Sequence, residues 1–233
     1  MERDVKMIDS GINGLVDGTL IQQTRCDTIS NNLANLGTYG FKRDVLSFDK
    51  VLTMKKYSAT DFSQGPAQHT GNPFDLAVEG QGFFKVQTEN GLRYTRNGAF
   101  RLDGTNTLVT LKGDPVLGEN GRITISGKDV SIGPDGEIQV DGVTVDRISI
   151  VDFEHSRLLR KEGATYYAFD REAEEVARPA EASLRQGYLE QSNVEVTEEM
   201  IRMVEAFRAF ETMQKGIQNI DDMTGKLVND SGL

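Results

Sequence analysis

The 233-residue chain has no tryptophan, one cysteine and two histidines. A single cysteine excludes a disulfide within the chain. His69 and His155 have no Cys or carboxylate cluster at metal-ligand spacing, so we predict neither a metal site nor a cofactor. The chain also lacks a phosphate-binding loop, a Gly-x-Ser-x-Gly elbow and a dinucleotide fingerprint. We therefore predict that the protein is not an enzyme and has no small-molecule substrate.

Long apolar runs are missing as well. No stretch of about 18 apolar residues exists, so we predict no membrane insertion. The amino-terminal stretch MERDVKMIDSG has neither a continuous apolar core nor a small-residue cleavage site, and we expect no cleaved signal peptide. The net charge of −10 is the wrong sign for attraction to phosphates, so nucleic acid is not an expected partner.

The first recognisable feature is an apolar seam at the amino-terminal end. Its spacing of three and four residues predicts a long helix that packs against another helix. Such a helix is only marginally stable alone, so it needs a partner. Gly37 is the predicted stop. The seam residues are Val5, Ile8, Ile12, Leu15, Cys26, Ile29, Leu33 and Leu36.

A second seam at the carboxyl-terminal end supplies that partner. Seam spacing predicts a helix from about Val196, with Ser192 or Thr197 as its candidate cap. Its seam residues are Met200, Met203, Phe207, Phe210, Met213, Ile217, Ile220 and Leu227. We expect the two terminal helices, within residues 1–40 and 190–233, to pair as a coiled coil.

The middle of the chain has the pattern of a β domain. Short apolar runs alternate with turn pairs such as Asn90-Gly91, Asn120-Gly121 and Asp141-Gly142. We predict an all-β sandwich or barrel over 74–170, an extended connector over 41–73 and a return connector or strand over 171–189. The predicted fold class is α+β, with this domain inserted between the paired helices. The expected strands are 75–79, 83–87, 99–102, 107–111, 122–125, 137–140, 147–153 and 165–169.

Two motifs have more than one interpretation. The amides of Asn31, Asn32 and Asn35 either cap a fraying helix end or form a polar contact surface between subunits. The segment at Asp103 could suggest a calcium loop, but it lacks the closing Glu, which favours a hairpin turn.

Several blocks resemble the rod and hook family of bacterial flagellar axial proteins. At the amino end the resemblance rests on Ser30, Asn31, Asn32, Leu33, Ala34 and Asn35, then Thr38, Gly40, Phe41 and Lys42. At the carboxyl end it rests on residues 187–194, which contain Ser192, Asn193 and Val194. Blocks 75–84 and 94–100 in the middle are similar to internal blocks of rod proteins.

This resemblance implies a self-assembling subunit of the flagellar basal-body rod, the periplasmic shaft that transmits torque from motor to hook. Its terminal helices would form the inner layer of the tube. The implied partners are further copies, other proximal-rod proteins, the distal rod protein and the flagellar type III export apparatus. Phe48, Val51 and Leu52 resemble the export-gate motif of early substrates, or they are simply a packed apolar cluster.

The position along the rod has two interpretations. The short connector before residue 75 and the block 71–76 are similar to the proximal-rod type, which we favour over a distal-rod protein. A different class of function, a ligand- or calcium-binding β module on a coiled-coil stalk, is the alternative to a rod subunit. A hydrolase using Asp103, Asp135 and Asp141 is a third.

Overall fold

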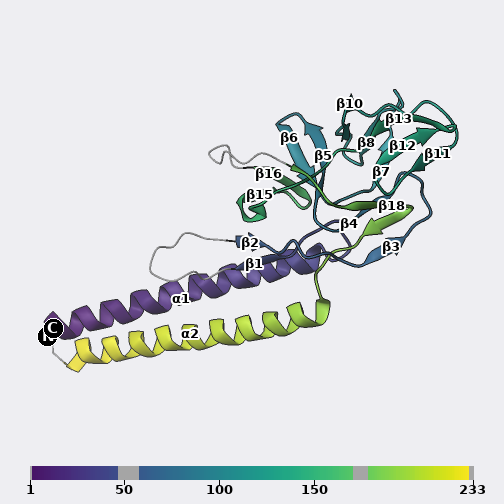
Figure 1. Ribbon diagram of the computed structural model, residues 1–233. Helices are drawn as coiled ribbons and strands as arrows, with labels where there is room; N and C mark the ends of the chain where they lie inside the picture. Colours follow the sequence, from purple (N-terminus) through teal and green to yellow (C-terminus); the bar gives the residue numbers. More distant parts are fainter. Residues whose placement is uncertain (1, 47–57, 170–177, 231–233) are drawn as a thin grey trace. The chain divides into compact units, whose positions relative to one another are not determined.

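The computed structural model describes residues 2–46, 58–169 and 178–230 (Figure 1). The chain divides into two compact units. A helical unit contains α1 (Glu2–Ala34) and α2 (Val196–Asp230). A β unit contains the described residues between 35 and 194.

The ends of the two helices follow local hydrogen bonding. The backbone N–H of Glu199 donates to the carbonyl of Glu195 at 3.0 Å, which places the start of α2 at Val196 as predicted. Glu198 and Glu199 lie in its first turn, where carboxylates complement the helix dipole. Helix α1 ends at Ala34, slightly before the predicted stop, and Thr38 N–H donates to the Asn35 carbonyl in the turn that follows.

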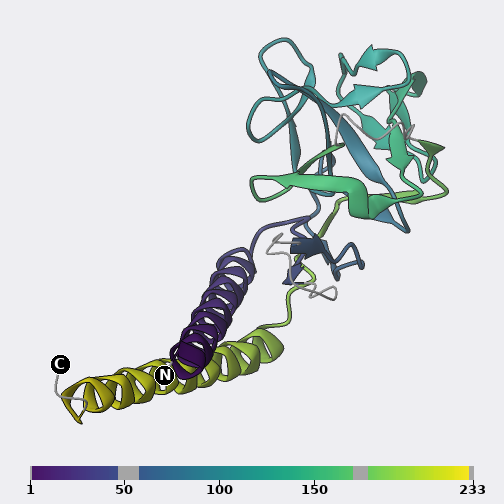
Figure 2. The same ribbon diagram turned by 90° about the vertical axis from the view of Figure 1, so that its left-hand side faces the viewer.

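The two helices of the helical unit run antiparallel (Figures 1 and 2). Small residues lie where they touch. A Cβ built on Gly18 would lie 2.9 Å from the sulfur of Met213. A Cβ on Gly216 would lie 3.3 Å from Leu15 Cδ1. Ala206 is fully buried. Glycine and alanine therefore bring the two backbones close together.

The strands of the β unit are short, between two and six residues long. The largest sheet has six strands in the order β15-β16-β6-β5-β14-β17, all antiparallel. These strands are β15 (Leu159–Glu162), β16 (Tyr166–Phe169), β6 (Gly91–Thr95), β5 (Phe83–Thr88), β14 (Ile150–Asp152) and β17 (Arg178–Pro179). A short 3-10 helix, η1 (Ser156–Leu158), precedes β15.

The other sheets are smaller, and two of them join distant parts of the sequence. One three-stranded sheet contains β11 (Val130–Ile132), β12 (Glu137–Val140) and β13 (Val143–Arg147). Three pairs are close in sequence: β1 (Asp44–Leu46) with β2 (Ser58–Thr60), β7 (Phe100–Leu102) with β8 (Leu108–Thr110), and β9 (Leu117–Gly118) with β10 (Gly121–Arg122). Two pairs are distant: β3 (Ala67–His69) with β19 (Tyr188–Glu190), and β4 (Leu76–Glu79) with β18 (Ser183–Gln186).

The β unit has two apolar clusters. The larger is aliphatic with two phenylalanines, Phe84 and Phe100, whose rings meet edge to face at 5.0 Å. The smaller is aromatic, and Phe83, Tyr94, Phe153 and Tyr167 are among its members. Burial of these side chains is the main source of stability in the β unit.

The predicted fold class is wrong in the form of its β domain. The strands of the described residues divide among seven sheets, so they form neither one sandwich nor one barrel. Frequent turns keep each strand short, and several strands pair with distant segments. In the helix pair, two residues of the predicted α2 seam, Met200 and Phe207, are 58% and 53% exposed, while Ala206, which the predicted seam does not include, is buried. Helix α2 is apolar on two faces, and α1 packs on the face with the small residues.

Candidate functional site

The turn that follows α1 leads into the β unit and becomes buried at Gly40. Gly40 has a φ of +67°, and a Cβ there would lie only 2.3 Å from the backbone nitrogen of Asn97. This position therefore requires glycine for both its backbone angle and its space. Phe41 and Lys42 after it are fully buried.

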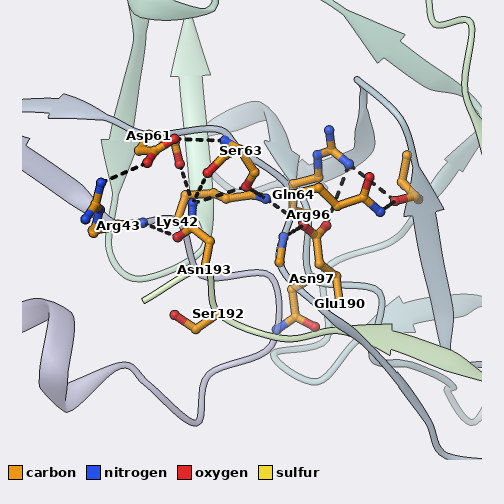
Figure 3. Close-up of polar contacts among 12 residues, drawn as sticks. Lys42, Arg43, Asp61, Ser63, Gln64, Arg96, Asn97, Glu190, Ser192 and Asn193 are labelled. Carbon is orange, nitrogen blue, oxygen red and sulfur yellow. Dashed lines mark hydrogen bonds and ion pairs between the residues drawn. The ribbon is translucent and has the colours of Figure 1, made fainter. Parts of the chain in front are cut away.

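Lys42 belongs to a buried ionic cluster that joins three segments of the chain (Figure 3). Its Nζ lies 2.6 Å from Glu190 Oε1 and donates to the Ser63 carbonyl at 2.6 Å. Arg96 NH1 lies 3.6 Å from Glu190 Oε2, and the backbone N–H of Gly65 donates to Oε1 at 2.8 Å. The three charged side chains are each at most 2% exposed. We call Lys42, Arg96 and Glu190 the ionic cluster.

Burial sets the electrostatics of this cluster. Desolvation lowers the pKa of Lys42, and the charge of Glu190 opposes that shift. Desolvation lowers the pKa of Arg96 in the same way, again against the attraction of Glu190. A buried charge is tolerated only when it is paired and hydrogen-bonded, and one carboxylate here serves two cations.

Asn193 ties the same segments together through its amide. Its Oδ1 accepts from the backbone N–H of Arg43 at 2.7 Å, and its Nδ2 donates to the Asp61 carbonyl at 2.8 Å (Figure 3). The N–H of Gly40 donates to the Glu190 carbonyl at 2.8 Å. The segment that leaves α1 and the segment that leads to α2 are thus bonded to each other within the β unit.

The sequence prediction missed two members of the cluster and a neighbouring cation. Glu190 and Arg96 were not predicted as site residues, although both lie in blocks that carry the family resemblance. Lys161 Nζ donates to the Lys42 carbonyl at 2.7 Å and lies 3.8 Å from the centre of the Phe41 ring. Its ion pair with Asp44 is 2.9 Å long. The signal that could have identified Glu190 and Arg96 was the presence of a charged residue in a block rich in glycine and aromatic residues. No sequence signal distinguished Lys161.

The helical unit has a polar contact at its inner face. Asn32 is 1% exposed, and its Nδ2 donates to Glu199 Oε2 at 3.2 Å. Arg202 NH1 donates to the other oxygen of Glu199 at 3.0 Å. Glu199 is itself 1% exposed, so both donors stabilise a buried carboxylate.

The outer side of α2 carries an apolar ridge. Val196, Met200, Val204 and Phe207 follow one another at spacings of four, four and three residues, which places them on one face. They are 38%, 58%, 51% and 53% exposed. We call these four residues the α2 ridge. Helix α1 exposes a smaller pair, Val16 and Leu20.

The predicted seam residues have several environments. Ile29 is buried, whereas Leu36 lies after the end of α1 and is 38% exposed. Leu15, Cys26, Leu33, Met203, Phe210, Met213, Ile217 and Ile220 are half-buried. The side chains of Val5, Ile8, Ile12 and Leu227, and the export-motif candidates Phe48, Val51 and Leu52, lie outside the described residues.

The family-signature residues divide between buried and exposed positions. Asn32, Gly40, Phe41, Lys42, Ser192 and Val194 are buried, and Leu33, Asn35, Thr38 and Asn193 are half-buried. Ser30, Asn31 and Ala34 are exposed. Ser192 Oγ accepts a hydrogen bond from the N–H of Val194 at 3.3 Å, just before α2 begins. The structure thus brings Lys42 and Asn193 together in the β unit and places Asn32 in the helix contact.

Asp103 forms a hairpin turn. Its Oδ1 accepts from the N–H of Thr105 at 2.8 Å and from the N–H of Thr107 at 2.9 Å. Throughout the described part of the chain, no group of three or more His, Cys, Asp or Glu side chains could hold a metal ion. Within the same residues, neither α-helix is apolar enough over its length to cross a membrane.

Three family models match the chain. Residues 18–42 match the model described as "Flagella basal body rod protein". Residues 77–140 match "Flagellar hook protein FlgE/F/G D1 domain". Residues 185–230 match "Flagellar basal body rod FlgEFG protein C-terminal". Lys42, Arg96 and Glu190 come one from each matched segment.

Curated relatives match almost end to end. Flagellar basal-body rod protein FlgG of Bacillus subtilis (strain 168) is 34% identical, over 97% of this chain and 98% of its own length. Flagellar basal-body rod protein FlgF of Caulobacter vibrioides is also 34% identical, over 94% and 98%. The FlgG of Borreliella burgdorferi is 31% identical, over 89% and 93%.

The chain belongs to the flagellar basal-body rod protein family. It is a structural subunit of the rod, and it belongs to the flagellar basal body. In this rod protein the ionic cluster joins all three family segments within the β unit. The α2 ridge, in contrast, is an exposed apolar surface of the helical unit.

Proposed function

We propose that this rod subunit assembles through its terminal helices, with the α2 ridge as a contact to a neighbouring subunit. The observation that carries the proposal is the exposure of four large apolar side chains on one helix face. Apolar patches of this kind in soluble proteins mark interaction sites. Covering them removes apolar surface from water, which drives association.

The contact we propose is head to tail. The α2 ridge and the pair Val16 and Leu20 belong to different helices, so two copies can place one patch against the other. A contact between two different patches repeats without closing and builds an extended array. The neighbours are further copies, other proximal-rod proteins and the distal rod protein.

Three finer features belong to the same proposal. The subunit leaves the cell interior through the flagellar type III export apparatus, without a cleaved signal peptide. It then forms part of the periplasmic shaft that transmits torque. It has no catalytic role and needs no cofactor, in keeping with relatives named as rod proteins.

We propose a proximal position in the rod. The block 71–76, which is similar to the proximal-rod type, supports this assignment. A short connector before residue 75 supports the same assignment. The alternative is a distal-rod protein. Immunogold labelling of purified basal bodies tests this: label nearer the hook would overturn the proximal position.

The test of assembly is Phe207→Asp, with Gln218→Asp as the matched control. Both positions are exposed on α2, so neither variant should disturb the isolated subunit. The first places a charge in the proposed contact, where its desolvation is unfavourable. We expect Phe207→Asp to abolish motility and recovery in basal bodies, while Gln218→Asp assembles. Normal rods containing Phe207→Asp would contradict the proposal.

A further inference from the structure

The chain contains four Asn-Gly pairs, at Asn13, Asn90, Asn97 and Asn120. In such a pair the backbone nitrogen of glycine can attack the side-chain amide carbon of asparagine, because no Cβ on glycine hinders the approach. The reaction requires the amide group to be free to turn toward the main chain. The four sites differ strongly in that freedom.

Three of the sites are held by the fold. Asn13 lies inside α1, whose regular helical backbone fixes the main chain on both sides of it. Asn97 Oδ1 accepts from Ala99 N–H at 3.0 Å, and its own backbone lies against Gly40. Asn120 Nδ2 donates to Asp146 Oδ1 at 3.0 Å.

Asn90 is different. It is exposed, and with Glu89 it forms the two-residue connection between β5 and β6. Among the described residues its side chain has no hydrogen-bond partner. Gly91 has a φ of +99°, and the space around its α-carbon holds only the end of the Arg93 side chain, at 3.9 Å from a built Cβ.

We propose that Asn90 is a site of spontaneous deamidation in the folded protein. The Gly91 nitrogen loses its proton and attacks Asn90 Cγ, forming a C–N bond. The bond from Cγ to the side-chain nitrogen breaks, and that nitrogen takes up a proton and leaves as ammonia. Water then opens the resulting succinimide at either carbonyl, which gives aspartate or isoaspartate.

The products change the hairpin in a defined way. Either product adds a carboxylate next to Glu89, so two negative charges stand at the tip of β5 and β6. Isoaspartate also adds a methylene to the main chain and shifts the close pairing of Thr88 with Gly91. This hairpin lies in the middle of the six-stranded sheet.

The experiment follows all four sites in one sample. The full chain is incubated in mildly alkaline buffer, digested with trypsin and analysed by mass spectrometry. Each pair falls in its own tryptic peptide: 7–25, 86–93, 97–101 and 113–122. We expect the 86–93 peptide to gain one mass unit about tenfold faster than the others, because those react only from locally opened states.

Two controls separate the effect of the folded structure on the deamidation rates from the effect of the local sequence. In concentrated urea the four rates should converge, since the protecting contacts are lost. Asn90→Gln should abolish conversion of the 86–93 peptide and leave the other three rates unchanged. Equal rates in the folded protein, or faster conversion at Asn97 or Asn120, would overturn the proposal.

Discussion

At the scale of single residues, Glu190 is a buried carboxylate that two buried cations share. Its carboxylate lies close to both Lys42 and Arg96, at 2.6 and 3.6 Å. A buried pair gains little over well-packed apolar residues, but removal of one partner leaves an uncompensated charge. We therefore expect the loss of one member of the ionic cluster to cost more free energy of unfolding than the intact cluster contributes.

Substitution of Glu190 tests this directly. Glu190→Gln keeps the shape and removes the charge, so we expect the free energy of unfolding to fall by about 3–5 kcal/mol. Urea unfolding monitored by circular dichroism measures it. Glu205→Gln, at an exposed site on α2, should stay within about 0.5 kcal/mol.

A double variant measures the interaction energy between Lys42 and Glu190 separately from the effect of each single substitution. In the double variant, Lys42→Met leaves the carboxylate of Glu190 without the lysine that it pairs with. Glu190→Gln then removes that unpaired charge. The combined loss should be smaller than the sum of the two single losses. Simple additivity would show that Lys42 and Glu190 are not coupled.

Asp103 gives a pH-dependent prediction. Hydrogen bonds from the Thr105 side chain and the Thr107 backbone lower the pKa of Asp103 below its ordinary value of 3.8. The folded state therefore favours the ionised form. Its contribution to stability is present above pH 3.8 and is lost as the pH falls through the lowered value. Asp103→Asn should lower the melting temperature at neutral pH, and the difference from wild type should shrink in acid.

A series of thermal melts at decreasing pH measures this effect. Asp129→Asn is the matched control, because Asp129 is also an exposed carboxylate near a hairpin turn. A difference between wild type and Asp103→Asn that stays constant down to strongly acid pH would contradict the prediction.

At the scale of elements, the helix pair is held by close approach of the backbones and by the polar contact between Asn32 and Glu199. Gly18 and Gly216 allow the backbones to come near each other, and the Asn32–Glu199 bond closes the end next to the start of α2. A polar bond at one place fixes the register of two apolar faces, as a buried polar residue does in coiled coils.

Asn32→Ala removes one donor from the buried Glu199 carboxylate. We expect a loss of about 1–3 kcal/mol, because the second donor, Arg202, remains. Hydrogen exchange should quicken in the first turns of α2. Gln23→Ala, at an exposed position on α1, serves as the control. Unchanged exchange in α2 would show that this bond does not hold the helices together.

At the scale of the whole molecule, the two units differ in what they need. Both apolar clusters and the ionic cluster lie inside the β unit, so this unit contains its own core. The helical unit keeps an exposed apolar ridge that a neighbour can cover. The β unit therefore has the core of an independently folded body, whereas the helical unit has the surface that we propose for contacts with neighbouring subunits.

Deletion of residues 1–34 and 195–233 tests that division. We expect the remaining chain to stay folded with a cooperative thermal transition, and to be absent from basal bodies. Calorimetry measures the first result and immunoblots of purified basal bodies the second. Recovery of the truncated chain in intact rods would contradict a helix-dependent assembly.

The sequence by itself determined the features that depend on local order. Apolar spacing predicted both long helices and the start of α2 at Val196, because periodicity is a local property. Turn pairs predicted strands such as β5, β7, β12 and β16. The blocks around Lys42 and Glu190 carried the family resemblance, which the comparisons confirmed.

Only the tertiary structure decided which surfaces meet. Lys42 and Glu190 are 148 residues apart, and nothing local marks a lysine as buried. Helix α2 is apolar on two faces, so spacing could not distinguish the buried Ala206 face from the exposed Phe207 face. The pairing of β3 with β19 and of β4 with β18 likewise depends on contacts between distant segments. Contacts between distant segments therefore determine which apolar face of α2 is buried and which strands pair, because the local sequence pattern is the same for the alternatives.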